Sequence, residues 1–97
     1  MKIFYVYVLL CADESFYVGI TSNLEQRLGQ HQFGWDEGCY TYKRRPVRCV
    51  HVSDFANFDD AMQWEKRLKG WSRAKKAALM NGEWKEVQRL AKRPSKR

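Results

Sequence analysis

The chain has 97 residues and a formal net charge of +7, and 44% of its residues are hydrophobic. This length is typical of one domain, and the apolar content is too high for an intrinsically disordered chain. No apolar run is long enough to cross a bilayer, so the composition excludes a helical membrane-spanning protein.

The charge is distributed unevenly along the chain. Residues 1–65 carry 6 Lys/Arg and 9 Asp/Glu, whereas residues 66–97 carry 12 Lys/Arg and 2 Asp/Glu, so the local net charges are −3 and +10. This asymmetry indicates a polyanionic partner, either nucleic acid or an anionic membrane surface; a solvated basic face that serves solubility is the alternative. Cys11, Cys39 and Cys49 lack CxxC spacing and no signal peptide is recognisable, so we expect a cytoplasmic protein without a disulfide framework.

The first part of the chain predicts a β-hairpin followed by a helix. Residues 3–11 (IFYVYVLLC) are β-branched and aromatic, as in a strand buried on both faces, and residues 16–20 (FYVGI) follow as its partner. Ser22 and Glu25 match a capping box, in which both side chains bind free amides at the helix start. The predicted helix ends just before Gly34.

The middle of the chain predicts a loop, a third strand and two helices. Residues 34–45 are polar and basic, as in a loop, and residues 47–54 (VRCVHVSD) alternate with period two, as in a strand. Asn57 is placed to cap the next helix, which ends at Gly70, and Ser72 to cap a helix over residues 73 to 80.

The C-terminal residues extend the predicted domain. Residues 83–92 predict a last short helix with Trp84, Val87 and Ala91 on one face. Residues 93–97 (RPSKR) predict a disordered basic tail, so a single domain is expected to cover residues 1–92.

The hairpin carries two tyrosine tripeptides, residues 5–7 (YVY) and 17–19 (YVG). Arg27 follows Tyr17 by ten residues, and His31 lies one helical turn further along, so both side chains share a helix face. The residues alone leave other readings open, because the tyrosines can be core aromatics and His31 can simply complement the helix dipole.

Glu65 is unusual because it shares the apolar stripe formed by Ala61, Trp64 and Leu68. A carboxylate at a core boundary is costly unless it is paired or binds a metal ion. An ion pair with Lys69, four residues further on, is the alternative to a metal site. The cysteines and histidines match no zinc-ligand spacing.

The ordered set of two tyrosine motifs, an arginine, a histidine and a helical glutamate resembles the GIY-YIG nuclease family. Residues 62–71 (MQWEKRLKGW) and 73–76 (RAKK) also resemble its small stand-alone bacterial members, and the similarity covers about residues 3–81. The resemblance implies an α+β fold with a three-stranded antiparallel sheet flanked by helices. It also implies an endonuclease that hydrolyses phosphodiester bonds in DNA with one divalent ion, Mg²⁺ or Mn²⁺, in structure-directed DNA repair or processing.

By this similarity, the catalytic residues are Tyr7, Tyr17, Arg27 and His31, and Glu65 is the metal ligand. One tyrosine would orient or deprotonate the attacking water, with its pKa lowered by Arg27 and the ion. The basic residues expected to bind nucleic acid are Arg44, Arg45, Lys69, Arg73, Lys75 and Lys76.

The chain departs from the family pattern at three positions, and the missing lysine and asparagine favour an alternative, a nucleic-acid-binding module with the same fold and little or no catalysis. Tyr5 replaces the glycine of the first motif, Ile20 replaces a lysine after the second, and Ala77 stands where several members have asparagine.

A shared site requires Tyr7 and Tyr17 to face the same side of the sheet. A two-residue hairpin loop at positions 13–14 would place them on opposite faces, whereas a three-residue loop at 13–15 would place them together. We therefore predict the three-residue loop.

Overall fold

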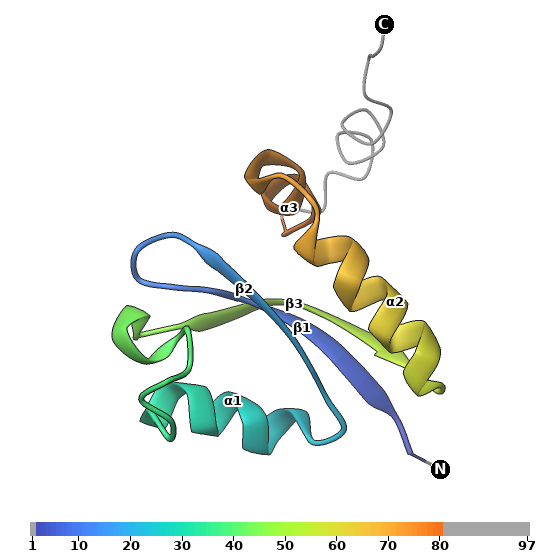
Figure 1. Cartoon of the computed structure of the whole chain (residues 1–97), viewed down its shortest axis with the longest axis horizontal. Coiled ribbons are helices and arrows are strands. Elements are labelled where there is room, and N and C mark those ends of the chain that lie inside the picture. The colour runs from blue at the N-terminus through green and yellow to red at the C-terminus, as the bar shows by residue number, and fades with distance from the viewer. Residues whose placement is uncertain (1, 81–97) are drawn as a thin grey trace, which may run out of the picture.

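The computed structural model describes residues 2–80, in which helices flank a three-stranded antiparallel sheet (Figure 1). The strand order is β2-β1-β3, with β1 at Phe4–Leu10, β2 at Phe16–Thr21 and β3 at Arg48–Phe55. The helices are α1 at Leu24–Phe33, α2 at Phe58–Lys69, α3 at Arg73–Met80 and the short 3₁₀ turn η1 at Tyr42–Arg44. The predicted α+β fold is confirmed. The helix and tail predicted over residues 83–97, and with them the end of the domain, lie outside the described residues.

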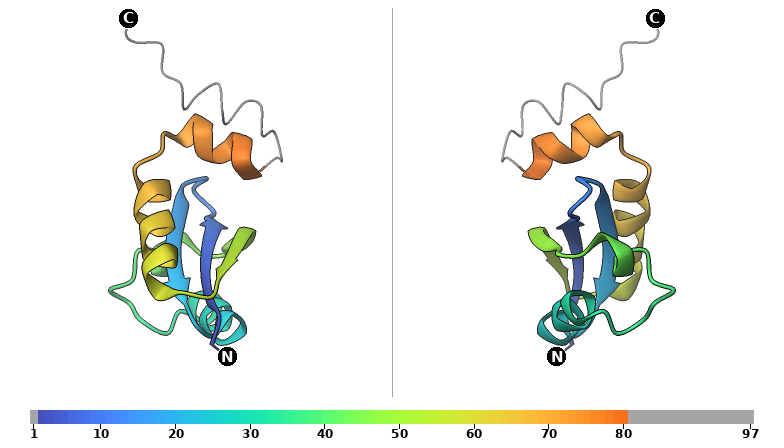
Figure 2. Two further views of the ribbon diagram at one scale, coloured as in Figure 1. Left: turned by 90° about the vertical axis from the view of Figure 1, so that its right-hand side faces the viewer. Right: turned by 90° about the vertical axis from the view of Figure 1, so that its left-hand side faces the viewer.

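Helices cover both faces of the sheet, which explains why β1 is buried throughout its centre. α1 lies on one face, whereas α2 and α3 lie on the other (Figures 1 and 2). Val6 and Val8 join the core beneath α2, while Tyr7 and Leu9 join the core beneath α1. All four side chains are at most 1% exposed. Alternate residues of one strand therefore supply two separate cores.

The hairpin turn has the predicted length but is shifted by one residue. The Cys11 N–H donates to the Ser15 carbonyl at 2.9 Å, and the Glu14 N–H donates to the Cys11 carbonyl at 2.8 Å. The loop therefore comprises residues 12–14 rather than 13–15. Glu14 has a positive φ of 68°, the left-handed conformation that a three-residue hairpin loop requires at its last position.

The strand register places both motif tyrosines on the α1 face. Tyr7 lies opposite Gly19 in the β1–β2 ladder, and Tyr17 is two residues from Gly19 on the same strand. Because side chains alternate along a strand, Tyr7 and Tyr17 point to the same side. The predicted shared face is confirmed, and the two ring centroids are 6.4 Å apart.

The cap of α1 is Asn23, so the prediction of Ser22 was wrong. The Asn23 side-chain oxygen accepts from the Gln26 N–H at 3.2 Å, and the Thr21 hydroxyl accepts from the Asn23 N–H at 3.0 Å. Serine and asparagine are equally good caps, so the sequence could not rank them. The helix ends at Gly34, whose φ of 77° is left-handed, as predicted.

The remaining elements lie close to their predicted positions. Asn57 caps α2, and the Ser72 hydroxyl accepts from an amide in the first turn of α3. The predicted alternation of β3 is interrupted, because Val8 pairs with His51 but Leu9 pairs with Cys49, which leaves an extra residue in β3. None of the helices in residues 2–80 has the length and apolar character needed to span a membrane.

Candidate active site

Three of the five predicted site residues, Tyr7, Tyr17 and His31, pack together beside β2, an edge strand of the described sheet. Tyr7 and Tyr17 come from the hairpin, and Arg27 comes from α1. Burial raises the pKa of both tyrosines, and the charge of Arg27 opposes that rise in each. Glu65 comes from α2 and pairs with Lys69, which lines the same depression as Tyr17. Residues from the hairpin, α1 and α2 thus lie near one another around β2.

A chain of buried hydrogen bonds links Tyr7 to the loop after α1. The Tyr7 Oη lies 2.9 Å from His31 Nε2, and His31 Nδ1 lies 2.8 Å from the Thr41 Oγ1. Tyr7, His31 and Thr41 are 0%, 2% and 1% exposed, respectively. Cys39 Sγ approaches the same group, 3.5 Å from Thr41 Oγ1. His31 is therefore a buried, doubly hydrogen-bonded side chain, not a surface residue that complements the helix dipole.

The ring of Tyr7 lies directly over Gly19, which explains the glycine of the second tripeptide. A Cβ atom at Gly19 would lie 2.4 Å from the Tyr7 Oη and 2.5 Å from Cζ. No real contact is that short, so any side chain at position 19 must displace the buried hydroxyl from His31.

We expect Gly19→Ala to lower the free energy of unfolding by about 1–3 kcal/mol, as overpacked sites typically do. The matched control is Gly29→Ala in α1, where an added Cβ meets no atom within 4 Å. That change should raise stability by about 0.5–1 kcal/mol, because alanine favours the helix. Urea unfolding measures both variants, and a Gly19→Ala protein as stable as the wild type would contradict the close packing over Gly19.

Arg27 was expected to help lower the pKa of a tyrosine, but the pKa of both tyrosines is raised. Burial raises the pKa of Tyr7, with a further contribution from Tyr17, and this outweighs the lowering by Arg27. Burial likewise raises the pKa of Tyr17. The pKa of His31 is lowered, first by burial and then by Arg27. Arg27 alone thus does not activate a tyrosine, and neutral His31 is the group in this cluster best able to accept a proton near neutral pH.

Glu65 has the predicted position on the apolar stripe of α2, where Ala61 and Leu68 are fully buried. Its side chain is 14% exposed, and Oε2 lies 3.1 Å from the Lys69 Nζ. The alternative partner proposed from the sequence is therefore present. Within residues 2–80 no three His, Cys, Asp or Glu side chains gather in a metal-ligating group.

The donors at this edge suit a hard divalent ion. A metal ion bound here would have Glu65 as its carboxylate ligand and would complete its coordination shell largely with water. Mg²⁺ is commonly bound in this way, through one or two carboxylates with several retained waters. Lys69 would have to release Glu65 for the ion to bind, and its largely exposed side chain has room to move.

Three of the six predicted basic residues lie beside the site. Lys69 and Lys76 line a depression of about 230 Å³ together with Tyr17 and Tyr40. The Arg44 guanidinium lies 3.9 Å from the centroid of the Tyr40 ring, which in turn stacks on Tyr17 with centroids 6.0 Å apart. All three cations thus lie close to Tyr17 or to Tyr40, which stacks on it.

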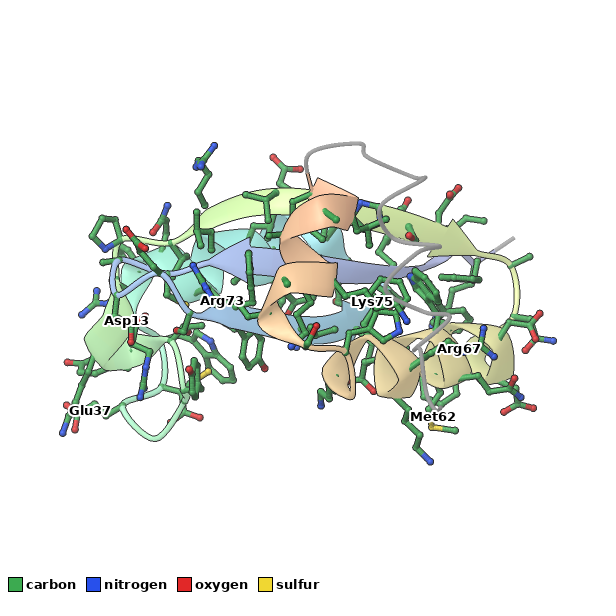
Figure 3. The ribbon with its side chains drawn as sticks, turned by 90° about the horizontal axis from the view of Figure 1, so that it is seen from above. Asp13, Glu37, Met62, Arg67, Arg73 and Lys75 are labelled. Carbon is green, nitrogen blue, oxygen red and sulfur yellow. The ribbon has the colours of Figure 1, made fainter. Side chains whose placement is uncertain are left out.

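The other three basic residues are engaged elsewhere on the protein. The Arg73 guanidinium lies 3.8 Å from the Glu14 carboxylate, and the Lys75 ammonium lies 4.0 Å from the centroid of the Trp71 ring. Figure 3 shows Arg73 and Lys75 pointing in different directions from α3. Arg45 donates to the Tyr42 carbonyl at 2.9 Å, and its guanidinium packs over the Tyr42 ring.

The loop between α1 and β3 supplies three neighbours of the site that sequence reasoning missed. Tyr40 stacks on Tyr17, Thr41 binds His31, and Cys39 lies beside both Thr41 and His31. A polar loop has no periodicity from which side-chain direction can be read. The only available signal was a tyrosine between polar residues, which is weak.

Comparison with known proteins agrees with this geometry. Residues 3–78 match the family model of the GIY-YIG catalytic domain. A UPF0213 protein of Natronomonas pharaonis is 49% identical over 80 residues, which cover 81% of this chain and 92% of the relative. One from Oceanobacillus iheyensis is 44% identical over 77 residues, which cover 78% of this chain and 87% of the relative.

Two solved structures are similar as well. The solution NMR structure of the UPF0213 protein BH0048 from Bacillus halodurans is 36% identical, with a TM-score of 0.55 over 91% of this chain and 96% of that one. The solution NMR structure of protein EF2693 from E. faecalis is also 36% identical, with a TM-score of 0.59 over 84% and 86% of the two chains.

Proposed function

The chain belongs to the GIY-YIG family, and from this premise we propose that it is a metal-dependent endonuclease that hydrolyses phosphodiester bonds in DNA. The observation that carries the proposal is that Tyr7 bonds His31 at 2.9 Å and Tyr17 packs beside them, while Lys69, the ion-pair partner of Glu65, lines the same depression as Tyr17.

Arg27 and Glu65 have different roles: Arg27 binds the phosphate directly, and Glu65 acts through a metal ion. The planar guanidinium of Arg27 binds a non-bridging phosphate oxygen and neutralises the charge that builds up there. Glu65 would hold the divalent ion, which would act as a Lewis acid on the phosphate. Lys69, the ion-pair partner of Glu65, lines the same depression as Tyr17.

The tyrosines and His31 act on the attacking water and its proton. Tyr17 is half-buried and borders the depression, so its hydroxyl orients the water there. As the water oxygen bonds to phosphorus, the bond to the leaving oxygen breaks, and the proton of the water is taken up through the Tyr7 hydroxyl by His31 Nε2, 2.9 Å away. Tyr7 does not need a lowered pKa, because it loses one proton as it gains another.

The basic wall of the depression binds the phosphate backbone on either side of the cleaved bond. We expect Lys76→Gln to reduce the slope of log affinity against log salt by about 0.9, the loss of one phosphate contact on B-form DNA. Lys75→Gln is the matched control, because the neighbouring lysine packs on Trp71 and does not line the depression. Fluorescence anisotropy with labelled DNA across a salt series measures both slopes, and equal slopes for the two variants would place the DNA elsewhere.

The test of the activity is incubation with labelled duplex, branched and single-stranded DNA, and with the matching RNA. Products should appear with Mg²⁺ or Mn²⁺ and disappear with EDTA. The second candidate function is a nucleic-acid-binding module, and the Glu65–Lys69 ion pair at 3.1 Å is the observation that favours it. Binding without cleavage of any substrate would support that candidate and reject the nuclease.

A further inference from the structure

We propose that Thr41 is a positioning residue that holds His31 in the Nδ1–H tautomer, so that Nε2 is free to accept the proton of Tyr7. The inference rests on the proposed nuclease function for its catalytic meaning, but the tautomer itself can be measured without any substrate. Thr41 belongs neither to the tyrosine motifs nor to the residues that the family resemblance picks out.

The geometry allows two assignments of hydrogens along the chain. Tyr7 Oη and Thr41 Oγ1 lie 2.9 and 2.8 Å from the two nitrogens of His31. A neutral imidazole has one N–H donor and one bare acceptor, so one hydroxyl must donate to the ring while the other accepts from it. Which nitrogen carries the hydrogen is set by the partner of the other nitrogen.

The surroundings of Tyr7 and Thr41 select one of the two assignments. Tyr7 is 0% exposed, and within residues 2–80 the hydrogen bond to His31 Nε2 is the only one that its hydroxyl makes. A hydrogen on Nε2 would leave the buried Tyr7 O–H without an acceptor, which costs free energy. The Tyr7 O–H therefore donates to Nε2, and Nδ1–H donates to Thr41 Oγ1. The Thr41 hydroxyl can then donate onward to Cys39 Sγ at 3.5 Å. In a free histidine the Nε2–H form is the more populated one, so Thr41 has to reverse an intrinsic preference.

The Thr41 hydroxyl does not cap the helix that begins after it. Thr41 occupies the N-cap position of η1, where a threonine side chain ordinarily accepts from a backbone amide. Here the side chain makes no capping hydrogen bond, and the Arg44 N–H goes to the Thr41 backbone carbonyl at 3.0 Å. Thr41 is 1% exposed, and its hydroxyl lies 2.8 Å from His31 Nδ1 instead.

The test compares Thr41→Val, which keeps the shape and removes the hydroxyl, with Thr41→Ser, which keeps the hydroxyl. Two-bond ¹H–¹⁵N spectra of the full chain above pH 7 should report a protonated Nδ1 and a bare Nε2 on His31 in the wild type. Thr41→Val should give the opposite or a mixed pattern, and Thr41→Ser should restore the wild-type pattern. On the preferred substrate, kcat should fall about tenfold to hundredfold in Thr41→Val, part of the usual contribution of acid–base catalysis, with KM unchanged.

Thr21→Val is the matched control for a general loss of stability. Thr21 is also buried, and its hydroxyl bonds the backbone at the start of α1 rather than His31. It should lower the melting temperature and leave the His31 tautomer as it is. A bare Nδ1 in the wild type, or a tautomer that Thr41→Val does not change, overturns the proposal, and the wild-type spectrum decides this even if Thr41→Val does not fold. Absence of cleavage by the wild type would reject the nuclease while leaving the tautomer result to stand on its own.

Discussion

Glu65→Gln is expected to reduce metal-dependent cleavage by about a hundredfold or more, because electrostatic stabilisation of a phosphoryl transition state is usually worth several kcal/mol. Glutamine keeps the size and hydrogen-bonding capacity of the side chain but removes the charge that retains a divalent ion. Binding of DNA in EDTA should be kept or strengthened, because a negative charge beside the phosphate is lost. Cleavage rates at equal protein concentration, together with Mn²⁺ binding followed by calorimetry, measure the effect.

The matched control is Lys69→Gln, which removes the other half of the 3.1 Å ion pair. If Glu65 serves only that pair, each variant should lose at most about 1 kcal/mol of stability, and neither should change the affinity for Mn²⁺. If Glu65 binds the ion, Lys69→Gln frees the carboxylate and should tighten Mn²⁺ binding, whereas Glu65→Gln should weaken it. Equal Mn²⁺ affinity in both variants would exclude Glu65 as the metal ligand.

The part of the site that could be predicted from the sequence lies on regular elements. Strand alternation and a hairpin of odd loop length place Tyr7 and Tyr17 on one face, and helical spacing places Arg27 beside His31. A one-residue error in the turn did no harm, because the loop at residues 12–14 has the same odd length as the one predicted. Any hairpin loop with an odd number of residues pairs Tyr7 with an odd-numbered residue of β2, and Tyr7 and Tyr17 then share a face.

The part that could not be predicted depends on a loop and on burial. Thr41 reaches His31 because the irregular segment after α1 folds back over the ring, and no repeating pattern encodes that path. The raised pKa of Tyr7 follows from complete burial between two layers, which a motif does not report. The different surroundings of Lys75 and Lys76, in contrast, could have been foreseen, since consecutive helical residues do not share a face.

The second large effect is expected for Tyr7→Phe, which should lower kcat by about a hundredfold, the usual contribution of general acid–base catalysis. The change removes the only hydroxyl bonded to His31 Nε2, at 2.9 Å. Tyr7 is 0% exposed, so its hydroxyl is not in contact with bulk water. Stability should fall as well, by about 1–3 kcal/mol, because a buried ring nitrogen loses its partner. Assays should therefore be run well below the melting temperature of the variant.

Tyr17→Phe should have a smaller effect than Tyr7→Phe. Tyr17 is half-buried at the rim of the depression, where a water molecule can stand in for its hydroxyl, and the phenylalanine ring keeps the stacking on Tyr40. Tyr5→Phe is the control on the same strand and the same face, and it should cleave as the wild type does.

The pH dependence of the cleavage rate also distinguishes Tyr7→Phe from Tyr17→Phe. Burial and Arg27 lower the pKa of His31, so the wild-type rate should hold down to about pH 6.5, the ordinary histidine value, and fall only below it as His31 becomes protonated. Tyr7→Phe cuts His31 off from the water, so its residual rate should lose this acid limb, whereas Tyr17→Phe should keep it. A larger loss for Tyr17→Phe than for Tyr7→Phe, or an acid limb that persists without Tyr7, would move the base to Tyr17. His31 would then act only by holding Tyr7 in place.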